Sequence, residues 1–215
     1  PVRPRRCRRG RGTRPAADAV HPDAAAAPVG RSVEALLFDL DGTLVDTREA
    51  NYQAYRGAFA ESGHDLTREQ FALTWGQDSR DFIPALLPGV QHAQVDVIRS
   101  AKSRLYGGLL DRTTLNDGLV AFLRLLAPHH RTALVSTAKS RNGAQLLEAH
   151  GLADLFDVVV WGDEVTRSKP DPEGYRRAMR RLGVGPSACL AFEDSDTGRQ
   201  AALAAGLLVV EVPFF

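Results

Sequence analysis

The sequence predicts an α/β protein built on a doubly wound parallel sheet, with an inserted α-helical domain. From Val33 onward, short apolar runs alternate with segments of helical period. The apolar runs are continuous rather than alternating, which is typical of parallel strands covered on both faces. One interval, 47–116, interrupts this alternation with helical patterns alone. Strands that alternate with helices indicate an open α/β sheet, and the interval indicates an insertion into it.

Five segments have the composition expected of buried strands. They are residues 33–39, 132–136, 157–161, 188–192 and 207–210. Each is short and rich in apolar residues, as strands inside a parallel sheet are.

Three helices are predicted between these strands. Residues 119–126 place apolar side chains at positions i, i+3, i+4 and i+7, and the pattern stops before Pro128. Residues 175–182 repeat this spacing and end at Gly183, a typical residue after a helix. Residues 201–205 are mostly alanine, so this helix can lie close to a sheet.

The interval 47–116 is predicted to be a small helical domain between the two parts of the α/β core, 33–46 and 117–215. No convincing strand occurs in it. Its apolar residues recur at helical spacing: Tyr52, Tyr55 and Phe59 in one segment, and Val95, Ile98 and Leu105 in another. In doubly wound sheets, ligands bind beyond the carboxyl ends of the strands. A domain that leaves the sheet from that end is expected to cover the site as a cap.

The basic character of the chain belongs to its first 32 residues. That segment holds eight arginines against Asp18 and Asp23, a net charge of +6. Subtracting this from the net charge of +1 for all 215 residues leaves −5 for residues 33–215. The segment has almost no large apolar residues, so we predict a disordered tail. An arginine-rich arm can bind the phosphates of nucleic acid. We nevertheless do not expect nucleic acid to be a partner of this protein.

Composition also indicates the cellular compartment of the protein. No apolar stretch approaches the roughly 20 residues that cross a bilayer, so we expect no membrane association. The two cysteines, Cys7 and Cys189, lie far apart and form no metal-binding spacing. This usage favours a reducing compartment, and we expect a cytoplasmic monomer.

The most informative stretch is FDLDGT, residues 38–43, where two carboxylates follow a buried strand. An Asp-x-Asp-Gly sequence can form a simple turn, and that interpretation stays open for the hexapeptide alone. An EF-hand calcium loop is excluded, because positions six and twelve counted from Asp39 hold Leu44 and Ala50.

The other strand ends carry polar groups as well. Beyond the strands lie Ser136 and Thr137, then Lys169, then Glu193 and Asp194. Carboxylates clustered at one sheet edge are costly without a cation, and their hard oxygens suit Mg²⁺. Asp39 and Asp41 lie at alternate positions of an extended segment, so both can face one substrate. One can attack phosphorus while the other donates a proton, and Lys169 and Ser136 can hold the phosphate oxygens.

Four segments in this order, FDLDGTLVD, ALVST, SKPDPEGY and FEDSDTGRQAALAAG, resemble the haloacid dehalogenase-like hydrolase superfamily over about residues 33–212. The place of the helical insert, between the first and second segments, is similar to that in the phosphoglycolate phosphatase and β-phosphoglucomutase branch.

The resemblance implies roles for individual residues. It makes Asp39 the nucleophile and a Mg²⁺ ligand, and Asp41 the general acid/base whose backbone carbonyl also binds the metal. It assigns phosphoryl binding to Ser136 and Lys169, and it completes the metal site with Glu193 and Asp194. Dehalogenation is not expected, because that chemistry uses neither Mg²⁺ nor an acid at the position of Asp41.

Several positions keep two interpretations. Lys139 competes with Lys169 for the phosphate, and Lys169 is preferred because the turn at Pro170 and Pro172 fixes its position. Thr137 either offers a backbone N–H to the substrate or caps the following helix. Arg80 is similar to a cap residue that grips a distal phosphate in the mutases, and is equally a surface arginine at a helix start. Where those mutases have a histidine, this chain has Asn51.

The sequence therefore predicts a Mg²⁺-dependent phosphatase that hydrolyses a small phosphorylated metabolite through an aspartyl-phosphate. A sugar-phosphate mutase similar to β-phosphoglucomutase is the alternative. A third hypothesis, from another class, is a nucleic-acid-associated protein that acts through the basic tail. Trp75 and Trp161 are both interpreted as packing residues.

Overall fold

The structure is a computed structural model that describes residues 32–213 and 215. The predictions of a disordered tail and of nucleic-acid binding through it fall outside these residues.

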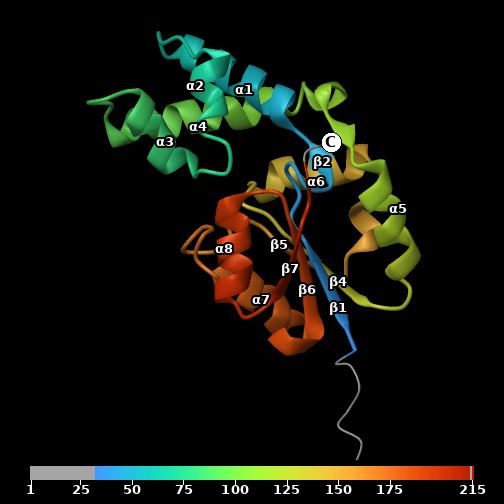
Figure 1. Cartoon of the computed structure of the whole chain (residues 1–215). Helices are drawn as coiled ribbons and strands as arrows, with labels where there is room; N and C mark the ends of the chain where they lie inside the picture. The colour runs from blue at the N-terminus through green and yellow to red at the C-terminus, as the bar shows by residue number, and fades with distance from the viewer. Residues whose placement is uncertain (1–31, 214) are drawn as a thin grey trace, which may run out of the picture. The chain divides into compact units, whose positions relative to one another are not determined.

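Within the described residues, five parallel strands form one sheet in the order β5-β4-β1-β6-β7 (Figure 1). The strands are β1 (Ala35–Phe38), β4 (Arg131–Val135), β5 (Val158–Val160), β6 (Cys189–Glu193) and β7 (Leu208–Glu211). The predicted strands lie within two residues of these bounds, and the predicted fold class is confirmed. The register pairs Phe38 of the central strand with both Leu134 and Phe192.

Helices cover both faces of this sheet, because alternate residues of β1 face opposite sides. Leu37 belongs to a buried cluster with α7 (Glu173–Leu182) and α8 (Asp196–Ala204). Leu36 and Phe38 belong to a second cluster with α5 (Asp117–Leu126) and α6 (Ser140–Ala149). The continuous apolar runs of the sequence thus reflect burial on two sides. Helix α6 was not among the predicted helices.

The inserted interval forms helices that pack around an apolar cluster of their own. They are α1 (Arg48–Glu61), α2 (Arg68–Ala72), α3 (Ser79–Leu86) and α4 (His92–Tyr106). Phe59, Phe71, Ile83 and Ile98 are buried among them. We call α1–α4 and their connections the cap; its boundaries at 47 and 116 stay a prediction.

The expectation of a strand-free interval is wrong at one point. The two-residue strand β3 (Thr114–Leu115) pairs antiparallel with β2 (Val45–Asp46). The two connections between sheet and cap run past each other here, and Val45 lies opposite Leu115.

Three short 3₁₀ helices complete the described elements: Leu110–Arg112, Ala153–Leu155 and Pro186–Ala188. No helix in residues 32–213 is long and apolar enough to span a membrane.

Candidate active site

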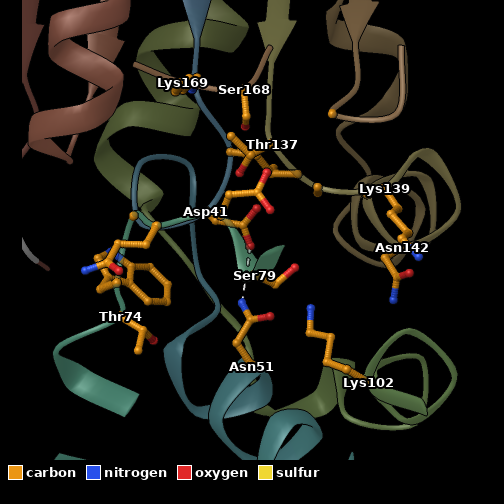
Figure 2. Close-up of a pocket in the computed structure, with 18 of the residues that line it drawn as sticks. Asp41, Asn51, Thr74, Ser79, Lys102, Thr137, Lys139, Asn142, Ser168 and Lys169 are labelled. Atoms are coloured by element: carbon orange, nitrogen blue, oxygen red, sulfur yellow. Dashed lines mark hydrogen bonds between the residues drawn. The ribbon is translucent and has the colours of Figure 1, made fainter. Parts of the chain in front are cut away.

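The polar residues predicted at the strand ends come together at one edge of the sheet. Asp39 follows β1 directly, Glu193 is the last residue of β6, and Asp194 comes next. Because the register pairs Phe38 with Phe192, Asp39 and Glu193 are neighbours across adjacent strands. Asp39, Asp41 and cap residues line one cavity of about 410 Å³, and Figure 2 shows a close-up of it.

Lys169 joins two of the carboxylates. Its Nζ lies 2.5 Å from Oδ1 of Asp39 and 2.6 Å from Oε1 of Glu193, and it also donates to the carbonyl of Val135 at 2.9 Å. The side chain of Lys169 is 8% exposed. Lys139 is exposed at the other side of the cavity and forms no ion pair with a described carboxylate. Of the two lysines weighed from the sequence, Lys169 is the one that contacts Asp39.

Burial dominates the electrostatics of this cluster. It raises the pKa of Asp39 well above its ordinary value, and the ammonium of Lys169 opposes that rise. Burial likewise raises the pKa of Glu193 against the opposing charge of Lys169, and raises the pKa of Asp194. For Lys169, burial lowers the pKa, but the charges of Asp39 and Glu193 outweigh it and the net shift is upward. Burial therefore disfavours the charged forms of these carboxylates, and Lys169 offsets that effect only in part.

The carboxylates have the arrangement that a cation requires. One oxygen each from Asp39, Glu193 and Asp194 lies within 4.8 Å of the others. Oε2 of Glu193 is buried without a hydrogen-bond partner. Two glycines leave room for these groups: a Cβ at Gly42 would lie 2.1 Å from Oδ2 of Asp194, and one at Gly198 would lie 2.0 Å from Oε2 of Glu193. These hard oxygens could hold Mg²⁺.

Asp41 is oriented by a short chain of hydrogen bonds. Oγ1 of Thr47 donates to Oδ1 of Asp41 at 2.6 Å, and Nδ2 of Asn51 donates to Oγ1 of Thr47 at 2.9 Å. The Asn51 amide also lies 3.5 Å from Asp41, the contact drawn in Figure 2. Thr47 precedes α1 and Asn51 lies in its first turns, so the start of the cap fixes the Asp41 carboxylate. In the sequence, Asn51 was noted only because it stands where the mutases have a histidine, and Thr47 was not singled out.

Ser136 and Thr137 follow β4. Ser136 is buried, and its hydroxyl accepts the backbone N–H of Ala138 at 3.0 Å. Thr137 is exposed and lines the cavity. Helix α6 begins at Ser140 with Lys139 as its N-cap, so the interpretation of Thr137 as a helix cap is wrong.

Arg80 is a partly exposed residue near the start of α3, and its contact with a distal phosphate stays a prediction. Its guanidinium donates to Asp78 at 3.1 and 2.7 Å, and Asp78 also accepts the N–H of Arg80 at the start of α3. The Arg80 side chain is 47% exposed and lines the cavity.

Lys102, on α4, is a cavity residue that the sequence analysis missed. Burial lowers its pKa to about 8. Its ammonium lies over the rings of Tyr55 and Tyr106, 5.1 and 4.4 Å from their centres, and it forms no ion pair with any described residue. Figure 2 shows it pointing toward Asp41. Ile98 faces the apolar interior of the cap, and Lys102 lies on the same helix face four residues later. A lysine at such an inward position was the feature of the sequence that could have identified it.

Trp75 was interpreted as a packing residue, and that interpretation is incomplete. Its indole Nε1 donates to Oδ2 of Asp194 at 3.2 Å, across the boundary between cap and sheet. Trp161 does pack, with its ring at the position that a Cβ of Gly143 would occupy.

Comparisons with known proteins agree with this fold. A family model for haloacid dehalogenase-like hydrolases matches residues 36–212. The chain is 36% identical over 194 residues to Protein CbbY of Rhodobacter capsulatus, covering 84% of this chain and 86% of the relative. It is 31% identical over 181 residues to a phosphorylated carbohydrates phosphatase of Thermotoga maritima, covering 81% and 82%. The solved structure of β-phosphoglucomutase from Clostridium difficile superposes with a TM-score of 0.73 at 25% identity, covering 83% of this chain and 84% of that one.

The family match runs over residues 36–212, which include the cap and nearly all of the sheet. The chain therefore belongs to the haloacid dehalogenase-like hydrolase family, in its phosphoglycolate phosphatase and β-phosphoglucomutase branch.

Proposed function

We propose that this hydrolase is a Mg²⁺-dependent phosphatase that cleaves a small phosphorylated metabolite through an aspartyl-phosphate on Asp39. The observation that carries the proposal is the contact of Asp39 with Lys169 beside Asp41, in a cavity that the cap helps to line. The relative from Thermotoga, which is named as a phosphorylated carbohydrates phosphatase, supports the same class of substrate.

In the proposed reaction, an oxygen of Asp39 attacks phosphorus and the bond from phosphorus to the ester oxygen breaks. Asp41 gives its proton to the departing oxygen. Asp41 then takes a proton from water, the resulting hydroxide attacks the phosphorus of the aspartyl-phosphate, and Asp39 and inorganic phosphate are released. The hydrogen bond from Thr47 keeps the Asp41 carboxylate directed at this position through both steps.

Electrostatic stabilisation comes from groups already in place. Lys169 is held beside Asp39 by two carboxylates and the Val135 carbonyl, which together take its three N–H donors. We propose that one of these donors turns to a phosphoryl oxygen, whose charge the ammonium then stabilises. We propose that Asp39, Asp194, Glu193 and the Asp41 carbonyl hold Mg²⁺, which would offset the charge of the carboxylates and of the phosphate. Ser136 and Thr137 are proposed to bind the remaining phosphoryl oxygens.

The cap indicates what else the substrate carries. Lys102 is a partly buried cavity cation that forms no ion pair with a described carboxylate, although the charge of Asp41 acts on it, and Arg80 is a second cation that lines the cavity. An ammonium that is partly stripped of water gains most from an anion that enters with the ligand. We therefore propose that the metabolite has a second anionic group, which Lys102 contacts.

Phosphatase activity is favoured over mutase activity because of Asn51. A mutase must present a sugar hydroxyl to the aspartyl-phosphate and exclude water. At the position where the mutases have histidine, this chain places an amide that donates to Thr47 and has no proton to exchange near neutral pH.

The cellular compartment of the enzyme is also a proposal. The buried free thiol of Cys189 suits a reducing compartment, and we propose a cytoplasmic enzyme. The expected monomer stays a prediction.

The direct test is phosphate release from a panel of phosphorylated sugars and carboxylic acids, with Mg²⁺ and with a chelator. Release that requires Mg²⁺ and that disappears in the Asp39→Asn variant supports the proposal. Equal release in the presence of the chelator contradicts the metal requirement, and no release from any compound contradicts the substrate class.

A further inference from the structure

The connection between α2 and α3, which we call the cap loop (73–78), lies against the end of β6. Two hydrogen bonds cross this boundary. Nε1 of Trp75 donates to Oδ2 of Asp194 at 3.2 Å, and Oγ1 of Thr197 donates to the carbonyl of Gly76 at 2.8 Å. Thr197 lies in the first turn of α8, only a few residues beyond Asp194. The cap loop therefore contacts the same short segment that supplies the proposed metal ligand.

The two oxygens of Asp194 are held from different parts of the fold. Oδ1 accepts from the hydroxyl of Thr43 at 3.2 Å, and Thr43 is completely buried beside β1. Oδ2 accepts from Trp75, which arrives from the cap. One oxygen is thus held from the sheet side, and the other is held by the cap loop.

The chemistry of the indole matters here. Its N–H is a neutral donor that cannot accept a hydrogen bond and does not titrate. It therefore orients the carboxylate without neutralising it, and a carboxylate oxygen has lone pairs for a metal in addition to one N–H. Hydrogen bonds to the carboxylates of metal sites commonly change metal affinity by 10- to 100-fold.

We propose that Trp75 is a positioning residue through which the cap completes the metal site, by holding Asp194 in the orientation that binds Mg²⁺. The inference rests on the proposed Mg²⁺ dependence. Because linkage between two equilibria is reciprocal, Mg²⁺ bound at Asp194 also stabilises the docked cap loop. The enzyme would then bind its metal most tightly in the conformation that encloses the substrate.

The test is calorimetric titration of Mg²⁺ into the full chain without substrate, for the wild type and for Trp75→Phe. Phenylalanine keeps an aromatic ring but cannot donate, so Mg²⁺ binding should weaken by roughly tenfold. Trp161→Phe, which changes the other tryptophan of the chain, is the matched control and should leave the affinity unchanged. Thr197→Val removes the second contact of the cap loop and should weaken binding in the same direction, even if Trp75→Phe folds poorly.

A second measurement uses fluorescence. Trp161→Phe leaves Trp75 as the sole tryptophan, since the chain has two. Its emission should change on addition of Mg²⁺, with a midpoint equal to the calorimetric dissociation constant.

Three results would overturn the inference. Unchanged Mg²⁺ affinity in both Trp75→Phe and Thr197→Val would mean that the cap loop only packs against the sheet. Tighter binding in Trp75→Phe would mean that the indole competes with the metal for Oδ2. No Mg²⁺ binding by the wild type would remove the metal-dependent function itself, and the inference with it.

Discussion

The ammonium of Lys169 lies between two buried carboxylates, 2.5 Å from Asp39 and 2.6 Å from Glu193. Asp194 is a third carboxylate in the same cluster. When all three carboxylates are ionised, the single lysine leaves a formal charge of −2, which a divalent cation would cancel. Since buried charges are stable only when they are compensated, this relationship is the strongest structural argument for the proposed Mg²⁺ site.

Replacement of the nucleophile should separate chemistry from folding. Asp39→Asn is expected to lower Mg²⁺-dependent phosphate release by more than about a thousandfold, because a neutral amide does not attack phosphorus. The fold should persist, since burial already disfavours the charged form of Asp39 and Lys169 keeps Glu193 as a partner. Circular dichroism and a melting curve measured beside the assay check both parts. Phosphate release close to that of the wild type would exclude an aspartyl-phosphate on Asp39.

The strand ends could be predicted from sequence because their signals are local. A continuous apolar run followed by Asp39 and Asp41, or by Glu193 and Asp194, shows both the strand and its functional end. The sequence already favoured Lys169 over Lys139, and in the structure Lys169 is the lysine that contacts Asp39.

The contribution of the cap could not be predicted in the same way. Trp75 reaches Asp194 across 119 residues of sequence, and that contact depends on how helices pack over a sheet. Lys102 interrupts an apolar helix face, which is a local signal, but Asp41, toward which it points, lies in a distant part of the sequence. Helix α6 was missed because its buried side includes Asn142 and Gly143, which do not read as an apolar stripe.

The activity should depend on the protonation of Lys102. Burial lowers the pKa of Lys102 to about 8, so the side chain is charged below that pH and neutral above it. A second anionic group on the substrate needs the charged form. We therefore expect kcat/KM to fall as the pH rises through about 8, and Lys102→Arg, which stays charged, to shift that fall to higher pH.

The control for this pH dependence is p-nitrophenyl phosphate, which has no second anionic group and should show no fall that depends on Lys102. The pH dependence of the free energy of unfolding checks the direction of the Lys102 pKa shift. Between pH 8 and the ordinary lysine pKa the unfolded chain binds more protons at this residue, so its contribution to the free energy of unfolding should increase with pH. A wild-type profile that Lys102→Arg leaves unchanged would exclude Lys102 from substrate binding.

Gly198 is expected to be required for the position of Glu193. Alanine is normally favoured over glycine within a helix by about 1 kcal/mol, so Gly198→Ala should stabilise α8 if only local propensity mattered. Its Cβ, however, would lie 2.0 Å from Oε2 of the buried Glu193. We expect a lower melting temperature and roughly tenfold weaker Mg²⁺ binding. Gly185→Ala is the matched control, because nothing lies within 4 Å of its Cβ. A stabilised Gly198→Ala variant with normal Mg²⁺ affinity would show that Glu193 has room to move.

The last prediction separates a phosphatase from a mutase, which share the aspartyl-phosphate and differ in what attacks it. In this chain the Asp41 carboxylate is held by Thr47, and Thr47 by the amide of Asn51. That arrangement leaves Asp41 ready to activate water, and it supplies no titratable group at the position of the mutase histidine. Incubated with a hexose 1-phosphate and a trace of the bisphosphate, the enzyme should therefore release inorganic phosphate faster than it forms the 6-phosphate isomer. Both products can be followed by phosphorus NMR in one sample. Accumulation of the isomer without inorganic phosphate would mean that the cap excludes water well enough for a sugar hydroxyl to win, and the mutase alternative would then replace the phosphatase.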